Sequence, residues 1–209
     1  SESSYLFYPA MASRSLIDVE APVETPNAAQ WLLHEGRDLP DSKAVLGGLA
    51  RVLADTGFAL YRLAVSTRTL PPQVLAIAYV WRRGDAEASE TLRDHGILDS
   101  PLYLQSPIRA IYDGAPEVRR RIEAPDCPMD FPILHELRAE GVTDYLALPM
   151  KFSRGRMATV AIATDRPGGF SNRELAEFCD LVPLLAVVLE VNETKRMMAA
   201  LLEIYLGQI

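Results

Sequence analysis

The sequence is poor in the residues that build metal centres and disulfide scaffolds. Its 209 residues include only two cysteines and three histidines. Cys127 and Cys179 lie far apart and outside any C-x-x-C pattern, which argues against both a zinc site and a disulfide framework. Each histidine has an acidic neighbour, but adjacent residues on a helix point in different directions, so no metal pair or catalytic dyad is predicted at His34, His95 or His135. A reducing compartment and the absence of a metal are expected.

Positive charge and long apolar runs are also scarce. The formal net charge is -7 and the pI is near 5.0, whereas nucleic-acid binding draws its affinity from clustered Lys and Arg. The one dense basic run, Arg119-Arg120-Arg121, is interpreted as a solvated strand face. The longest apolar stretch, Leu181 to Leu189, is too short to cross a bilayer and contains Pro183. We expect a cytoplasmic protein without nucleic-acid or membrane partners.

The glycine loops that hold nucleotide phosphates are missing as well. Neither G-x-x-x-x-G-K-[ST] nor G-x-G-x-x-G occurs, and Gly47-Gly48 falls inside a helical pattern. ATP turnover within this chain is therefore not expected, and no catalytic residue is assigned.

What the sequence does contain is typical of a globular domain. Hydrophobic residues make up 49% and charged residues 23%, close to the average for folded soluble proteins. The length favours one domain with a helical extension. We interpret residues 1–25 as a tail or cloning remnant, 26–191 as the domain and 192–209 as the start of a signalling helix.

Hydrophobic periodicity predicts two hairpins separated by a long excursion. Short helices are expected at 27–33 and from Asp41-Ser42 to Gly57, followed by strands at 58–65 and 74–81. Residues 82–141 contain six prolines and are predicted to form an ordered excursion over the sheet, with helical pieces at 86–94, 107–112 and 133–140. A second hairpin is expected, with strands at 143–152 and 156–164.

A long amphipathic helix closes the sequence. Ser171 and Glu174 have the spacing of a capping box, and the helix is predicted to run to Tyr205. Its first half carries an apolar face for the sheet. An overlapping stripe with three-and-four spacing predicts a parallel homodimer through Leu184, Val187, Val191, Met198, Leu201 and Tyr205. A frayed tail is the alternative.

This order of elements resembles a GAF-type sensor domain. The best matching segments are 144–150, which looks like the family's penultimate strand, and 170–175, which resembles the entry to its last helix. The resemblance covers about residues 28–191. It implies an α+β fold in which an antiparallel sheet of about six strands has helices on both faces, a ligand pocket on one face and a long C-terminal helix.

A second, shorter resemblance concerns the missing output. Residues 201–207, Leu-Leu-Glu-Ile-Tyr-Leu-Gly, are similar to the segment that leads into the catalytic domain of bacterial class III adenylate cyclases. Residues 31–36 resemble the N-terminal region of such proteins. This similarity implies a regulatory half whose catalytic domain lies outside this sequence.

Aromatic residues supply the remaining functional signal. Rings on the strands and in the excursion suit an unidentified small organic ligand, with Arg109 and His135 as polar anchors. The expected ligand-binding set is Tyr79, Trp81, Tyr103, Arg109, Tyr112, Phe131, His135 and Tyr145. The alternatives are that these rings only fill the core of a ligand-free dimerisation module, or that Cys127 makes the chain a GAF-type redox enzyme.

Overall fold

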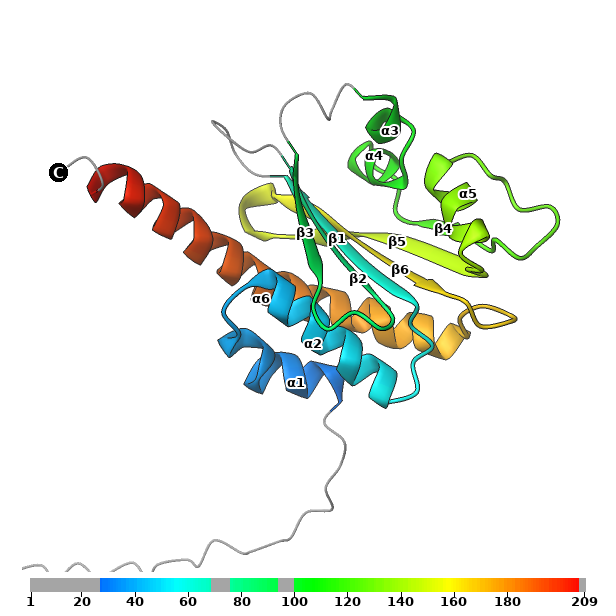
Figure 1. The fold of residues 1–209 in the computed structure, drawn as a ribbon, viewed down its shortest axis with the longest axis horizontal. Coiled ribbons are helices and arrows are strands. Elements are labelled where there is room, and N and C mark those ends of the chain that lie inside the picture. The colour runs from blue at the N-terminus through cyan, green and yellow to red at the C-terminus, as the bar shows by residue number, and fades with distance from the viewer. Residues whose placement is uncertain (1–26, 69–75, 94–99, 207–209) are drawn as a thin grey trace, which may run out of the picture.

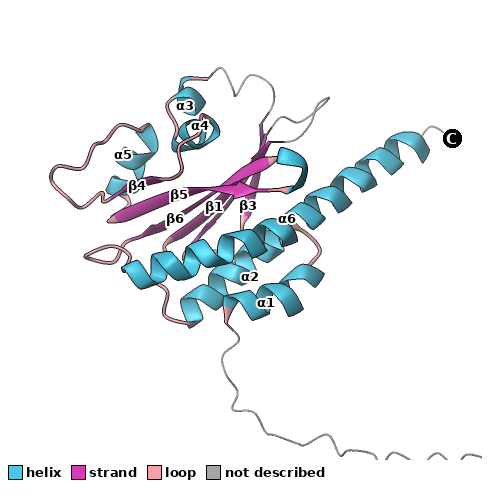
Figure 2. Cartoon of the chain, turned by 180° about the vertical axis from the view of Figure 1, so that it is seen from behind, coloured by secondary structure: helices cyan, strands magenta, loops and turns pink. Residues whose placement is uncertain are grey.

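The computed structural model describes residues 27–68, 76–93 and 100–206, and the excluded segments include the N-terminal tail predicted at 1–25. A six-stranded sheet lies between two groups of helices (Figures 1 and 2). Its order is β3-β2-β1-β6-β5-β4, and every neighbouring pair is antiparallel. The strands are β1 (Arg62–Arg68), β2 (Ala76–Arg82), β3 (Ser89–Arg93), β4 (Val118–Arg120), β5 (Asp144–Lys151) and β6 (Met157–Thr164). The expected α+β fold with an antiparallel sheet is confirmed.

Three helices cover one face of the sheet. They are α1 (Ala28–His34), α2 (Ser42–Asp55) and α6 (Asn172–Leu206), with the 3-10 turn η1 (Gly36–Asp38) after α1. Carboxylate and amide caps fix where the first two begin, since Asp41 accepts from the Ala44 amide and Asn27 from the Gln30 amide. Leucines and valines from these helices and from the sheet form the larger hydrophobic core.

Short helices cover the opposite face. They are α3 (Pro101–Leu104), α4 (Pro107–Tyr112) and α5 (Pro132–Ala139). Each begins with a proline, which costs no hydrogen bond at a first helical position, and serines cap α3 and α4. A second, smaller core around Ile111, Leu134 and Leu137 lies beneath α4 and α5. The described part of the excursion is therefore ordered, as its prolines predicted.

The helix α6 begins at the predicted capping box. The Ser171 amide donates to Glu174 at 2.8 Å, while the Glu174 amide donates to the Ser171 hydroxyl at 3.2 Å. The helix continues for 35 residues, and its C-terminal part runs beyond the sheet (Figure 1). No helix among the described residues is long and apolar enough to span a membrane.

Two local predictions are wrong. The segment predicted as helix at 86–94 contains the edge strand β3, which has polar side chains on both faces and therefore lacks a strand-like apolar alternation. Cys179, predicted to be a small buried residue of the last helix, is exposed to solvent. Its neighbour Phe178 takes the buried position instead.

The second hairpin forms as expected, whereas the basic run, predicted to be a solvated strand face, has two partly buried arginines that form ion pairs within the domain. The turn between β5 and β6 is a 3-10 turn, η3 (Ser153–Gly155), in which both Arg154 and Gly155 have positive φ angles. The run of arginines lies on β4 and the residue after it. Arg119 binds the buried carboxylate of Asp144 at 2.8 Å, and Arg120 binds Asp130 at 2.5 Å. These arginines are neutralised within the domain.

Candidate functional site

The two faces of the central strands carry side chains of different size. On β1, Leu63 and Val65 point towards the helices α1, α2 and α6 and are fully buried. Their neighbours Ala64 and Ser66 point towards the excursion, because successive side chains of a strand alternate between faces. The same face of the neighbouring strands is small as well. Alanines there include Ala76, Ala78, Ala147, Ala161 and Ala163.

The strand register brings these small residues together as a floor. Ala64 on β1 pairs with Ala161 on β6, which pairs in turn with Ala147 on β5. One row of the sheet therefore presents methyl groups alone across three strands. The short side chains leave space that the excursion does not fill.

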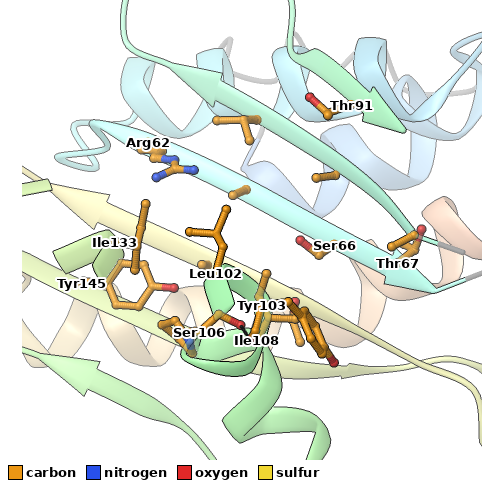
Figure 3. A pocket seen from close by; sticks show the side chains of 18 of the residues that line it. Arg62, Ser66, Thr67, Thr91, Leu102, Tyr103, Ser106, Ile108, Ile133 and Tyr145 are labelled. Atoms are coloured by element: carbon orange, nitrogen blue, oxygen red, sulfur yellow. Dashed lines mark hydrogen bonds between the residues drawn. The ribbon is translucent and has the colours of Figure 1, made fainter. Parts of the chain in front are cut away.

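A cavity of about 340 Å³ lies between this alanine floor and the helices α3, α4 and α5 (Figure 3). Its walls include Leu102, Tyr103 and Ile108 from the first two helices and Ile133 from the third. Its size is at the lower end of the range for small-molecule sites, and its lining is mostly apolar with few polar groups. The arrangement suits binding of a small organic molecule.

Arg62 and Tyr145 occupy one end of the cavity. Both pair with Ala163 in the register, so they lie in one row with a methyl group between them. The guanidinium of Arg62 and the hydroxyl of Tyr145 point into the cavity (Figure 3). Burial, followed by the like charge of Arg82, lowers the pKa of Arg62. The guanidinium nevertheless stays protonated. Burial raises the pKa of Tyr145 to about 12, against the opposing effect of Arg62.

Arg68 and two tyrosines occupy the other end of β1. The Arg68 guanidinium lies 3.6 Å from the centre of the Tyr112 ring and 5.4 Å from that of Tyr103. The Tyr112 hydroxyl donates to the Met157 carbonyl at 2.9 Å, and burial raises the pKa of Tyr112. Within the part of the chain that the structure describes, the buried Tyr103 hydroxyl and the Arg68 Nε have no hydrogen-bond partner.

Three of the predicted ligand residues line this cavity, namely Tyr103, Tyr112 and Tyr145. Two others lie on the wrong side of the sheet. Tyr79 and Trp81 belong to the helix-side core, where the Trp81 indole donates to the Asp85 carbonyl at 3.0 Å. The prediction placed these rings on one face correctly, but periodicity alone does not say which face a ligand occupies.

The other three predicted residues also lie outside the cavity. Arg109 forms an exposed ion pair with Asp113 at 2.7 Å, one turn further along α4. Phe131 packs against the smaller core and under the guanidinium of Arg120, 5.3 Å from its ring centre. His135 is exposed on α5. None of these side chains is placed to anchor a ligand in the cavity.

The prediction missed the two cavity arginines, Arg62 and Arg68. The signal that identifies them is the sequence of β1, Arg-Leu-Ala-Val-Ser-Thr-Arg, in which large apolar residues alternate with small ones and arginines end the small face. In a strand this alternation gives one packed face and one open face.

A buried polar cluster joins the sheet to α6 on the opposite face. Glu193 accepts a hydrogen bond from the Tyr79 hydroxyl at 2.8 Å and from Ser42 at 3.4 Å. Burial, followed by the charge of Glu193, raises the pKa of Tyr79. One turn later, Arg196 donates to the Tyr79 hydroxyl at 3.3 Å and to Glu90 of β3 at 2.8 Å. The sheet therefore holds α6 beyond Asn192, where the signalling helix was predicted to begin.

Other chemically active groups are dispersed. The described residues contain no cluster of His, Cys, Asp and Glu that would hold a metal ion. Cys127 is half-buried, lies 3.7 Å from the Pro128 carbonyl and does not belong to the cavity lining.

No protein-family model matches the sequence, and no curated protein matches it either. Solved structures do match the fold. The GAF domain of a phosphoenolpyruvate-protein phosphotransferase from Coxiella burnetii has a TM-score of 0.52 at 12% identity, over 83% of this chain and 96% of that chain. The A. aeolicus NLH2 GAF domain has a TM-score of 0.52 at 9% identity, over 80% of this chain and 96% of that chain. A phycocyanobilin-bound GAF domain from a cyanobacterial phytochrome has a TM-score of 0.51 at 12% identity, over 84% of this chain and 98% of that chain. The chain has the GAF fold.

Proposed function

We propose that this chain is a non-catalytic sensor domain that binds a small molecule in the cavity and passes the change to α6. The observation that carries the proposal is the alanine floor, because a sheet face of small residues under short helices leaves space for a small molecule. The bilin bound to the phytochrome domain is a precedent for ligand binding by this fold.

The edge strand β3 provides a route from the cavity to α6. Thr91 lines the cavity, and the preceding residue, Glu90, points to the opposite face and binds Arg196. A ligand that displaces Thr91 also displaces Glu90, since the two share one stretch of backbone. A coupling of about 1–3 kcal/mol is sufficient for a useful switch.

We further propose that α6 forms a parallel homodimer. Val187, Val191, Met198 and Leu201 are 45–60% exposed along the predicted stripe, and no described part of the chain covers them. Leu184 is partly buried against the domain's own core, so it contributes less. Tyr205 lies within α6, but its side chain is outside the described part. Exposed apolar residues at heptad spacing are typical of a coiled-coil seam.

The output that we propose is a nucleotide cyclase domain following residue 209 in a cytoplasmic protein. This rests on the resemblance of residues 201–207 to the segment that precedes class III cyclase domains. Joining the chain to such a domain and measuring cyclic AMP formation, with the Arg196→Gln variant in parallel, tests the assignment. A rate independent of both the sensor domain and Arg196 would contradict it.

Sedimentation equilibrium tests the dimer. Replacing Met198 by Glu places a charge in the proposed seam, and we expect dissociation to monomers at concentrations where the unchanged protein is dimeric. Ala199→Glu is the matched control because Ala199 is exposed on the helix beside the stripe. A monomer at high micromolar concentration before any substitution, or equal effects of both variants, would contradict the dimer.

A further inference from the structure

The charge of the cavity is opposite to that of the chain. The formal net charge of the protein is -7, yet among the described residues the ionisable lining consists of Arg62, Arg68 and one acid, Glu136, besides tyrosines. A positive excess in a hollow lined mainly by apolar groups attracts anions more strongly than it would in open water, because the local dielectric constant is low.

Arg62 lacks the carboxylate partner that several partly buried arginines elsewhere in this domain have. Arg119 and Arg156, for example, bind Asp144 and Glu190 at 2.8 and 2.6 Å. Among the described residues, no carboxylate lies within ion-pair distance of Arg62, and its buried Nε has no hydrogen-bond partner. Glu140 and Glu136 act on it only from further away. A partly buried cation without a partner costs stability, and proteins keep such groups mainly where they serve function.

The row formed by Arg62, Ala163 and Tyr145 places a hydrogen-bond donor on each side of a methyl group. The strands are about 4.8 Å apart, so the two polar residues stand about 10 Å apart at their Cα atoms, with a methyl group between them. Both side chains point over this gap (Figure 3). A carboxylate or phosphate above Ala163 can accept hydrogen bonds from the guanidinium and from the tyrosine hydroxyl.

The rest of the cavity defines the body of the ligand. Beyond Ala163 the floor is the alanine row at Ala64, and Leu102 and Ile133 form the roof (Figure 3). A floor of methyl groups facing branched alkyl side chains favours an aromatic or otherwise flat apolar group. The Arg68 guanidinium, stacked on Tyr112, limits the far end.

We propose that the cavity binds a small organic anion, a carboxylate or phosphate ester with a flat apolar body, whose acidic group pairs with Arg62 and Tyr145. The inference rests on the proposed sensor function and names the chemical class of its ligand.

Calorimetric titration with matched probes tests the ligand class. The probes are naphthalene-2-carboxylate, 2-naphthyl phosphate and the neutral naphthalene-2-carboxamide. We expect at least one acid to bind the unchanged protein tenfold or more tightly than the amide, because charged hydrogen bonds are the strong ones. Whichever acid binds more tightly distinguishes carboxylate from phosphate recognition.

Substitutions test whether Arg62 and Tyr145 cause the tighter binding of the acid. Arg62→Gln should remove the advantage of the acid, and Tyr145→Phe should reduce it several-fold. Arg109→Gln should leave it unchanged, since Arg109 lies outside the cavity. Equal binding of acid and amide, or a preference that survives Arg62→Gln, overturns the anion assignment but leaves a ligand-binding cavity. Absence of binding by all three probes at 10 mM overturns the assignment as well.

The melting temperature without ligand gives a second test that needs no probe. Since Arg62 is an unpaired cation, Arg62→Met should raise the melting temperature of the free protein. A lower melting temperature would show that Arg62 holds the fold together and would overturn its assignment as a ligand anchor. The sensor proposal would survive that result if cyclase output still depended on Arg196.

Discussion

The helix side and the excursion side of the sheet use the same strands for different purposes. On the helix side, Leu63 and Val65 interlock with residues of α2 and α6, and Tyr79 and Trp81 complete the packing. On the excursion side the intervening positions are alanine and serine, and a cavity remains. Size alternation within a strand, added to the alternation of polar and apolar residues, therefore indicates which face packs as core and which face leaves a cavity.

The two faces also differ in how much they contribute to the stability of the fold. Buried leucines and valines give the helix side most of its hydrophobic free energy, whereas a cavity lacks the dispersion contacts of a filled core. The excursion side forgoes that packing and retains two arginines without carboxylate partners among the described residues. Such sites are common where binding is selected over stability.

The largest expected effect comes from truncating the helix side. Leu63 is fully buried, and Leu63→Ala should lower the free energy of unfolding by about 2–5 kcal/mol because it removes methyl groups and leaves a cavity. Urea denaturation followed by circular dichroism measures the loss. A loss below about 1 kcal/mol would show that this face is not the main core.

The next effect concerns the attachment of α6 to the sheet. Burial raises the pKa of Glu174, but hydrogen bonds from Arg166, Ser171 and the Ala59 amide outweigh burial and hold it at about 2. Glu174→Ala should cost about 1–3 kcal/mol at pH 7. Because the folded pKa is depressed, this contribution is present above about pH 4.5 and disappears as the pH falls towards 2.

Denaturation of wild type and variant across this pH range checks both statements. Glu177→Ala is the control, since Glu177 forms an exposed ion pair with Arg173 and should matter by less than about 0.5 kcal/mol. A difference between wild type and Glu174→Ala that stays constant down to pH 2 would exclude the carboxylate as its cause.

A smaller effect of opposite sign is expected on the helix side. Asn192 is 5% exposed on α6, and neither polar atom of its amide has a hydrogen-bond partner in the described chain. Asn192→Leu keeps a similar shape and should raise the free energy of unfolding by about 1 kcal/mol. Thermal and urea denaturation measure the gain. A loss would indicate that the amide has a partner in the assembled protein, such as the second helix of a dimer.

The smallest change in stability is expected from filling the cavity. Ala64→Leu adds bulk above the floor where space exists, so the free energy of unfolding should change by less than about 1 kcal/mol, while binding of the naphthyl acids is lost. Ala158→Leu adds the same bulk to a fully buried helix-side position and should cost about 1–3 kcal/mol. Similar costs for both variants would remove the distinction between the faces.

Much of the fold was predictable because its signals are local. The capping box at Ser171, the prolines that begin the short helices and the two hairpins all depend on neighbouring residues. The edge strand β3 was missed because it is paired on one side and polar on both faces. Local patterns do not report such tertiary pairing.

The site was less predictable, since it depends on which face each strand presents. Tyr145 lines the cavity, but Tyr79 was placed in the pocket although it lies in the helix-side core. The arginines at the ends of β1 were overlooked because the pairing of Arg62 with Ala163, a residue far along the sequence, does not follow from local patterns. Periodicity predicts which residues share a face of a strand. Which elements pack against each face depends on segments that are distant in the sequence.

The edge position of β3 affects how fast this strand opens, as well as linking the cavity to α6. This strand is held to the sheet by one ladder, to β2, and local opening of such an edge costs much less free energy than global unfolding. Amide hydrogens of β3 should therefore exchange sooner than those of β1 or β6, and a bound ligand in contact with Thr91 should slow them. The opening rate of β3 would limit how quickly the proposed sensor responds to a ligand.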